Sequence, residues 1–207
     1  MPRVVFAHGW GFDKTLWVDT IKRFKFNDYY LLDFGYTGNR DIVSICQTEP
    51  LIGIGHSLGF AWLLQNLENP VCLISISGFD CFFKIYDSRD IEHVRRNLIR
   101  NKQAQMRAFH RRAGTKLTNL PSFEEQYLIE GLEHLQTWDF NHRLKSLNIP
   151  IFAIASQNDK IIPLRHSKRM FENCFLKIIP SGDHVIPINN QPDYFKFIEK
   201  VLREFRI

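Results

Sequence analysis

A serine flanked by glycines stands where it could act as a nucleophile. The segment Gly55-His56-Ser57-Leu58-Gly59 follows an apolar run typical of a buried strand, Leu51–Gly55, and precedes Phe60–Leu67, which has helical period. A sharp turn between a strand and a helix holds a serine in a strained backbone conformation and projects its hydroxyl above the sheet. The glycines leave room for the strand and helix to cross. We therefore predict that Ser57 is the nucleophile of an acyl-transfer reaction.

A serine hydroxyl is a weak nucleophile until a base takes its proton, so the chain must also supply a histidine. A Gly-x-Ser-x-Gly turn in this setting is typical of the α/β-hydrolases, in which the acid and then the histidine follow the serine along the chain. That order selects His184, in a loop between the last predicted strand and the last predicted helix. A solvated surface role is predicted for five other histidines in helical or linker segments: His93, His110, His134, His142 and His166.

The acid should follow the strand before the histidine loop, where its carboxylate can accept the imidazole Nδ1 proton. Asp159 comes just after the apolar run Pro150–Ala155 and fits that place. Asp80, after the run Val71–Ser77, is one rival. Asp183 is the other, but it adjoins the histidine and cannot easily reach round its neighbour's ring. We favour Asp159 as the acid.

The reaction also needs donors aimed at the oxyanion of the tetrahedral intermediate. The amide after the nucleophile, that of Leu58, is one expected donor. The second is the amide of Trp10, in the turn His8-Gly9-Trp10-Gly11 after the first predicted strand. With these donors the site is complete for acyl transfer and requires no cofactor and no metal.

The elements that must position these residues alternate along the chain. Six short apolar runs rich in β-branched residues are predicted to be buried strands: Arg3–Ala7, Tyr29–Asp33, Leu51–Gly55, Val71–Ser77, Pro150–Ala155 and Phe175–Ile179. Segments of helical period lie between and after them: Thr15–Phe24, Leu58–Leu67, Pro163–Phe171 and Pro192–Phe205. This alternation predicts an α/β-hydrolase fold, with a mostly parallel sheet and helices on both faces, in one domain over residues 1–207.

One stretch breaks the alternation. From about residue 82 to 123 no strand is predicted, and the sequence is basic and favours helix, as in Ile91–Phe109. We predict a short helical cap here, inserted after the fourth strand, with a helix over Tyr127–Leu135 leading back to the sheet. Lys84–Lys116 holds ten Lys and Arg against three acids, a local charge of +7, so the rest of this +5 chain carries −2. Charge confined to one segment indicates a docking surface for an acidic partner.

Composition argues against several other classes of protein. With 44% hydrophobic residues in 207, the chain can form a packed core. We expect a cytoplasmic protein, because no leader with an apolar h-region opens the sequence and no apolar run approaches the roughly 18 residues of a membrane span. The four cysteines show neither disulfide-framework nor zinc-ligand spacing. No nucleic-acid partner is expected, since no finger, helix-turn-helix or RNP pattern accompanies the basic charge. Oligomeric state is left open.

Taken together, these residues make the chain resemble the pimeloyl-[acyl-carrier protein] methyl ester carboxylesterases of biotin synthesis, a branch of the α/β-hydrolases. Many hydrolases share the first two blocks that carry the resemblance, the His8–Gly11 turn with Trp17 and the elbow Gly55–Gly59. The third block supplies most of the specificity, and its residues are Gly131–Leu135, Asp139, Leu144, Pro150, Asp159 and Pro163. The resemblance covers both ends of the chain and leaves the cap weakly matched.

The resemblance implies an enzyme that cleaves the methyl ester of a pimeloyl chain on the phosphopantetheine arm of acyl-carrier protein and releases methanol. It also implies that basic cap residues bind the acidic carrier, and arginine suits recognition of carboxylate or phosphate. The candidates are Arg95, Arg96, Arg100, Arg107, Arg111 and Arg112. Phe109 is similar to a family aromatic that lines the acyl channel.

The chain also departs from the family's pattern. We expect the antiparallel strand pair before the His-Gly strand to be missing and the cap to be shorter, and His56 stands where the family often has tryptophan. These departures bear on acyl-chain length and carrier preference. Two alternatives stay open: a general short-chain carboxylesterase whose basic cap is only a solvated face, and a non-catalytic protein that uses the hydrolase fold to bind a ligand or carrier.

Overall fold

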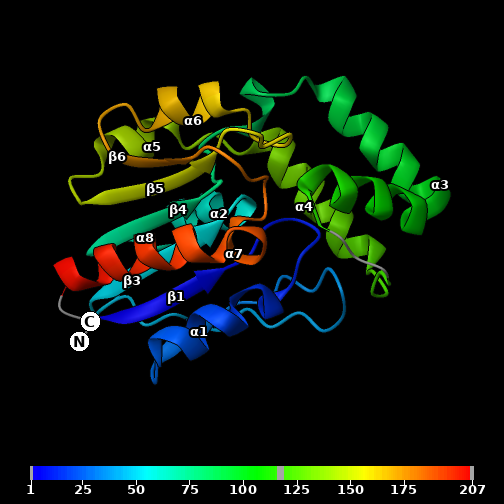
Figure 1. Cartoon of the computed structure of the whole chain (residues 1–207). Coiled ribbons are helices and arrows are strands. Elements are labelled where there is room, and N and C mark those ends of the chain that lie inside the picture. Colours follow the sequence, from blue (N-terminus) through cyan, green and yellow to red (C-terminus); the bar gives the residue numbers. More distant parts are fainter. Residues whose placement is uncertain (1, 116–118, 206–207) are drawn as a thin grey trace.

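The computed structural model describes residues 2–115 and 119–205 and has one sheet at its centre (Figure 1). Its strand order is β2-β1-β3-β4-β5-β6, and every strand pairing in these ranges is parallel. The strands are β1 Arg3–Ala7, β2 Tyr29–Leu31, β3 Leu51–His56, β4 Cys72–Ile76, β5 Ile151–Ser156 and β6 Phe175–Ile179. The predicted α/β fold with a parallel sheet is therefore confirmed.

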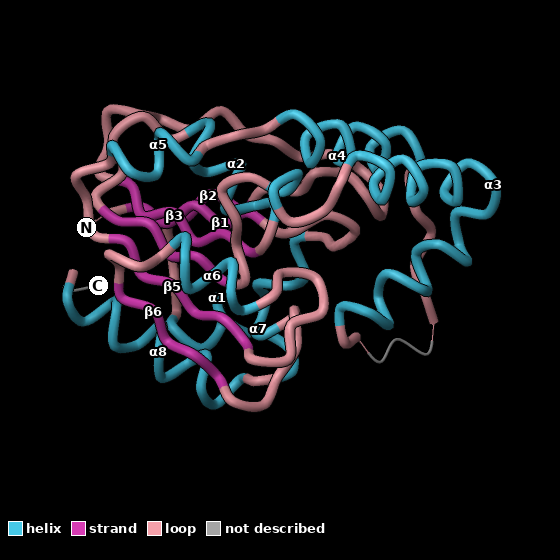
Figure 2. The backbone as a smooth tube through the Cα atoms, turned by 90° about the horizontal axis from the view of Figure 1, so that it is seen from above, coloured by secondary structure: helices cyan, strands magenta, loops and turns pink. Residues whose placement is uncertain are grey.

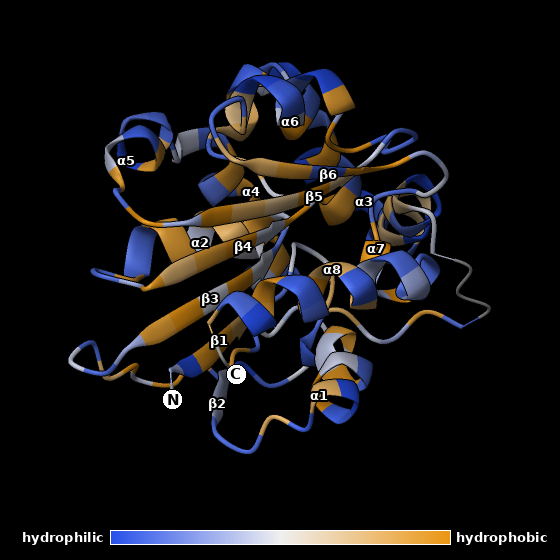
Figure 3. Ribbon diagram, turned by 60° about the vertical axis from the view of Figure 1, so that its left-hand side comes forward, coloured by the Kyte–Doolittle hydropathy of each residue, from blue (hydrophilic) through white to orange (hydrophobic). Residues whose placement is uncertain are grey.

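Helices cover both faces of this sheet. Figure 3 shows α1 and α8 on one side and α2 and α6 on the other. The helices are α1 Val18–Phe24, α2 Leu58–Asn66, α3 Ser88–Ala113, α4 Glu125–Thr137, α5 Asn141–Ser146, α6 Leu164–Met170, α7 Ile186–Asn189 and α8 Gln191–Glu204, with 3-10 turns η1 Lys14–Trp17 and η2 Phe82–Lys84. Helices α5 and α7 were not predicted, because segments of six and four residues are too short to show a helical period.

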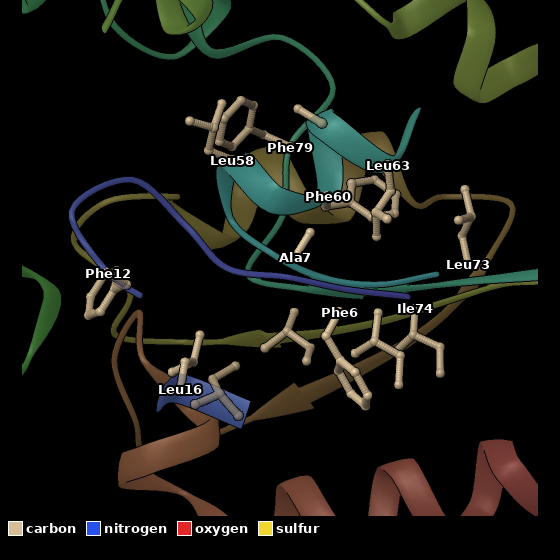
Figure 4. Packing of buried hydrophobic residues seen from close by; sticks show 14 of the residues in the cluster. Phe6, Ala7, Phe12, Leu16, Leu58, Phe60, Leu63, Leu73, Ile74 and Phe79 are labelled. Carbon is tan, nitrogen blue, oxygen red and sulfur yellow. The ribbon is translucent and has the colours of Figure 1, made fainter. Parts of the chain in front are cut away.

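The core lies on both faces of the central strands. In Figure 4, Phe6 and Ile74 point to one side of the sheet, and Phe60 and Leu63 on α2 pack against the other. Strands β3, β4 and β5 are therefore buried along their whole length. The prediction of a buried strand is wrong for β6, where Phe175 is 41% exposed, because β6 is an edge strand of the sheet.

The connection between β4 and β5 contains helices and loops but no strand of the sheet among its described residues. Figure 2 shows the longest of these helices, α3, extending beyond one end of the sheet beside α4. Helix α3 is interrupted at Asn101, whose φ of −159° and ψ of 85° are not helical. Its side chain accepts a hydrogen bond from the amide of Ala104 at 3.0 Å, so Asn101 caps the second half of α3. Residues 116–118, inside the range predicted as the cap, lie outside the described residues.

Candidate active site

Parallel strands bring four loops to one edge of the sheet. The loop containing Trp10 follows β1, Ser57 follows β3, Asp159 follows β5 and His184 follows β6. In a parallel sheet all carboxyl ends point the same way, so these loops meet although the residues are far apart in sequence. The topology alone therefore gathers the residues that the sequence singled out.

The Ser57 turn has the strained geometry expected of a nucleophile elbow. Ser57 has φ 54° and ψ −120°, a conformation that costs a non-glycine residue free energy. A Cβ at Gly59 would lie 2.0 Å from the carbonyl oxygen of Ala7, and one at Gly55 would lie 2.5 Å from Cα of Phe60. Only glycine fits at either position, which confirms the reason given for both glycines.

Asp159 and His184 form a buried hydrogen-bonded pair. Oδ2 of Asp159 lies 2.9 Å from Nδ1 of His184, and both side chains are at most 2% exposed. Oδ1 of Asp159 accepts from the amides of Ile161 at 2.7 Å and Ile162 at 2.8 Å. The carboxylate is thus fixed from both sides, so Nδ1 carries a proton and the Nε2 lone pair of His184 is left for another proton.

The two rival acids are engaged elsewhere. Asp80 accepts a hydrogen bond from Nδ2 of Asn141 at 2.8 Å. Asp183 accepts from the amide of Val185 at 3.2 Å and from the side chain of Asn189. Neither carboxylate bonds to a histidine ring among the described residues. The geometry therefore favours Asp159 over both.

The histidine loop lies against the elbow. Nε2 of His56 lies 3.0 Å from the carbonyl oxygen of His184, and the centroids of the two imidazoles are 4.9 Å apart. Nε2 of His184 is buried and makes no hydrogen bond within the described chain, so the Ser57 hydroxyl is not bonded to it in this conformation. Catalytic hydrogen bonds often reach their working length only when substrate binds.

His56 is a neighbour of the site that the sequence marked only as a departure from a family pattern. A carbonyl oxygen only accepts, so Nε2 of His56 must carry the proton donated to His184. Burial, followed by repulsion from the charged form of His184, holds the pKa of His56 well below its usual value. His56 is therefore neutral. No local pattern could reveal this contact, because its partner is 128 residues away.

The two expected oxyanion donors have unused amides. Neither the amide of Trp10 nor that of Leu58 donates a hydrogen bond to another described residue. A Cβ at Gly9 would lie 3.0 Å from Cβ of Ser57, so glycine allows this loop to approach the serine closely. The indole of Trp10 donates to the carbonyl oxygen of Leu128 on α4 at 2.8 Å, which fixes the loop.

A cavity of about 540 Å³ lies between this loop and the helices after β4. Trp10 and Ile161 contribute to it from the catalytic loops, and Phe109 contributes from α3. The ring of Phe109 packs edge-on against Trp10, with centroids 4.7 Å apart. The apolar wall thus begins beside the expected oxyanion donor. Among the described residues, no cluster of three or more His, Cys, Asp or Glu side chains is placed to hold a metal ion.

The six candidate arginines differ in their surroundings. The side chains of Arg96, Arg100, Arg107 and Arg111 are exposed on α3. Arg95 lies 3.6 Å from Glu92 in an ion pair. Nε of Arg112 donates to the carbonyl oxygen of Lys160 at 3.0 Å, and its Nη2 donates to the hydroxyl of Tyr86 at 3.0 Å. Arg112 therefore bonds to the acid loop.

The prediction of a solvated surface role is wrong for His110, which is only 4% exposed. Its Nε2 donates to the carbonyl oxygen of Gly11 at 2.9 Å, and burial lowers its pKa to about 4. His93 and His142 are exposed as predicted, and His134 stacks on Trp138 with centroids 4.0 Å apart. The helical period of a segment predicts on which face of the helix a residue lies, but it does not show whether a loop from elsewhere in the chain covers that face.

The chain belongs to the alpha/beta hydrolase family, whose sequence profile matches residues 4–195. It is similar to the pimeloyl-[acyl-carrier protein] methyl ester esterase of Legionella pneumophila (strain Paris), with 28% identity over 203 residues, covering 84% of this chain and 82% of the relative. The same protein from strain Corby matches to the same extent. These relatives confirm the resemblance noted from the sequence.

Solved structures show the same fold. The esterase EaEST from Exiguobacterium antarcticum has a TM-score of 0.82 with 15% identity, covering 98% of this chain and 92% of its own. A lipase-esterase related protein from Clostridium acetobutylicum has a TM-score of 0.74 with 21% identity, covering 96% and 93%. Among the described residues no helix has both the length and the apolar character that crossing a membrane requires.

Proposed function

We propose that this chain is a serine carboxylesterase in which Ser57, His184 and Asp159 act as nucleophile, base and orienting acid. The observation that carries the proposal is the buried Asp159–His184 pair, whose Nε2 has no partner among the described residues and whose loop lies against the strained Ser57 turn. A nucleophile, a base and an orienting acid arranged in this way are the groups that a serine esterase uses for ester hydrolysis.

The reaction follows from the proton positions. His184 Nε2 takes the hydroxyl proton of Ser57 as Oγ attacks the ester carbonyl, and Asp159 stabilises the imidazolium through Nδ1. The amides of Trp10 and Leu58 donate to the oxyanion. The imidazolium then protonates the departing alkoxide, and the alcohol leaves. Water activated by the same histidine hydrolyses the acyl-enzyme and restores the free serine.

For the substrate, we propose the methyl ester of a pimeloyl chain carried on acyl-carrier protein. Three observations support it. The curated relatives carry that substrate in their name. The cavity beside Trp10 offers apolar walls for an acyl chain. Helix α3 bears eight basic side chains against two acids, which suits an acidic carrier, and Arg96, Arg100, Arg107 and Arg111 are exposed on it.

Methanol release from pimeloyl-carrier methyl ester tests the proposal. The wild-type protein should release methanol, and Ser57→Ala should reduce turnover by about 10⁴-fold or more, because loss of the nucleophile removes the acyl-enzyme route. A fluorophosphonate should label the wild type and leave Ser57→Ala unlabelled. Equal turnover by the two proteins would end the assignment, and an unlabelled wild type would favour a binding protein that has kept only the fold.

A general short-chain carboxylesterase is the second candidate, favoured by the engagement of Arg95 and Arg112 with neighbouring groups. Replacing the exposed arginines by glutamate distinguishes the carrier-specific esterase from the general carboxylesterase. The residues to replace are Arg96, Arg100, Arg107 and Arg111. If a carrier docks there, KM for the carrier-bound ester rises about tenfold or more, whereas p-nitrophenyl acetate is hydrolysed as before. Equal efficiency of the wild type on free and carrier-bound esters would favour the second candidate.

A further inference from the structure

The end of helix α3 bonds to, or just beyond, three of the four loops that carry the proposed catalytic groups. His110 Nε2 donates to Gly11 O, in the oxyanion loop, at 2.9 Å. Arg112 Nε donates to Lys160 O, in the acid loop, at 3.0 Å. The carbonyl oxygen of Gly114, which caps α3, accepts from Asn189 Nδ2, beyond the histidine loop, at 3.0 Å. The three contacts come from five consecutive residues, 110–114.

The contact with the acid loop is the most extensive. The hydroxyl of Tyr86 lies 2.9 Å from the carbonyl oxygen of Ile161 and 3.1 Å from that of Lys160, and it accepts from Nη2 of Arg112 at 3.0 Å. The guanidinium also lies over the Tyr86 ring, 5.4 Å from its centroid. The amides that bond to Oδ1 of Asp159 belong to this segment, those of Ile161 and the next residue. Arg112 and Tyr86 thus hold the backbone that holds the acid.

The contact with the histidine loop passes through one amide group. Nδ2 of Asn189 donates to the carbonyl oxygen of Gly114. It also lies 2.8 and 2.9 Å from the two carboxylate oxygens of Asp183. Asp183 directly precedes His184, and its carboxylate accepts a hydrogen bond from the amide of Val185, the residue that directly follows His184. The residues on either side of the base are therefore tied to the end of α3.

The contact with the oxyanion loop is buried. The ring of His110 packs against Phe12, with centroids 4.9 Å apart, and its Nδ1 lies 3.0 Å from Oγ1 of Thr115. Its Nε2 carries the proton, since the carbonyl oxygen of Gly11 only accepts. The bond therefore fixes the backbone just after Trp10, the expected oxyanion donor.

We propose that residues 110–114 of this chain are a positioning element, which holds the oxyanion, acid and histidine loops in register for the chemistry. The inference rests on the proposed function, because it takes those three loops as catalytic. Each loop leaves a different strand, and a shared helix end removes their independent motion. Catalytic groups must be held to within about 0.5 Å, and a displacement of about 1 Å can cost 10²-fold in rate.

Arg112→Met tests the element, because it keeps an unbranched, flexible apolar side chain and removes every side-chain donor. Hydrolysis of p-nitrophenyl acetate, a substrate too small to need the cap, is measured per active site counted by fluorophosphonate. We expect kcat per site to fall about tenfold with KM changed less than twofold. Arg112→Lys, which can still reach the Lys160 carbonyl, should recover part of the loss. Arg169→Met, at an exposed arginine of α6 with no polar partner among the described residues, is the matched control.

Hydrogen exchange gives a readout that does not depend on catalysis. The amides of Ile161 and Ile162 should exchange about tenfold faster in Arg112→Met than in the wild type and Arg169→Met. Tyr86→Phe removes one oxygen and serves if Arg112→Met does not fold, and Asn189→Leu repeats the test at the histidine loop. Unchanged kcat per site and unchanged exchange in these variants would overturn the inference. An unlabelled wild type with faster exchange in the variants would instead overturn the proposed function and leave the positioning contacts standing.

Discussion

Replacing the proposed acid by its amide, Asp159→Asn, exchanges one carboxylate oxygen for an NH₂ group and should abolish most of the activity. The Asn carbonyl can keep the hydrogen bonds from the amides of Ile161 and Ile162. Its NH₂ group then faces His184 Nδ1 at the place of the present 2.9 Å bond. Because NH₂ only donates, Nδ1 must become the acceptor, and the imidazole proton moves to Nε2. The base can then no longer take the proton of Ser57.

The size of the effect follows from this change of tautomer. A wrong tautomer in a Ser-His-Asp triad costs about 10⁴-fold in kcat, which is about 5.5 kcal/mol of activation free energy. The free energy of unfolding should fall less, by about 1–3 kcal/mol, because the two backbone bonds survive and only the charge on the acceptor is lost. Activity and stability should therefore separate clearly.

The assay compares kcat for a p-nitrophenyl ester, the rate of fluorophosphonate labelling and the circular dichroism of the folded protein. Both rates should fall by a similar factor in Asp159→Asn. Asp80→Asn is the control, because Asp80 follows a neighbouring strand but its carboxylate bonds only to Asn141 among the described residues; the activity of this variant should stay within twofold. A folded Asp159→Asn with kcat within tenfold of wild type would refute the reasoning, as would an equal loss in Asp80→Asn.

Three further perturbations test the neighbours of the site. Burial lowers the pKa of His110 to about 4, so as pH falls the unfolded chain takes up this proton before the folded protein does, and the free energy of unfolding decreases between about pH 6.5 and 4. In urea titrations, His110→Gln should reduce the loss of unfolding free energy between pH 7 and pH 5 by about 2 kcal/mol. Gly131→Ala places a Cβ 2.4 Å from Cδ1 of Trp10 and should lower both kcat and the unfolding free energy, the latter by about 1–3 kcal/mol, whereas Gly38→Ala meets nothing within 4 Å and should do neither. His56→Phe leaves the carbonyl of His184 without its donor and should cost about 1–3 kcal/mol in thermal unfolding; an unchanged melting temperature would contradict that hydrogen bond's role.

The sheet could be predicted because its signals are local. Apolar runs of strand length alternate with segments of helical period, and all six predicted strands are present. Their burial could not be predicted as well. Phe175–Ile179 looks like a central strand in sequence, but it lies at the edge of the sheet. Position within a sheet depends on which strands pair, and that information is spread over the whole chain.

The candidate triad could be predicted from the sequence for a similar reason. Ser57 carries a short motif, and His184 and Asp159 follow from chain order and from the rule that loops at carboxyl strand ends meet. The contacts that surround these residues could not be predicted from the sequence. His110 looks like one more polar residue of a basic helix, yet it is buried against Gly11. Arg112 looks equivalent to Arg111, yet only Arg112 reaches the acid loop.

The fold class and the strained turn at Ser57 could be read from the amino-acid sequence, because each depends on residues within about one or two neighbouring elements of the chain. The sequence favoured Asp159 as the acid, and the structure shows its hydrogen bond to His184. Which histidine stays neutral beside His184, and that one end of α3 bonds to or beside three of the loops, could be seen only in the tertiary structure. Those contacts join residues from 25 to 128 positions apart, and their free energy depends on burial and direction, which no local pattern encodes.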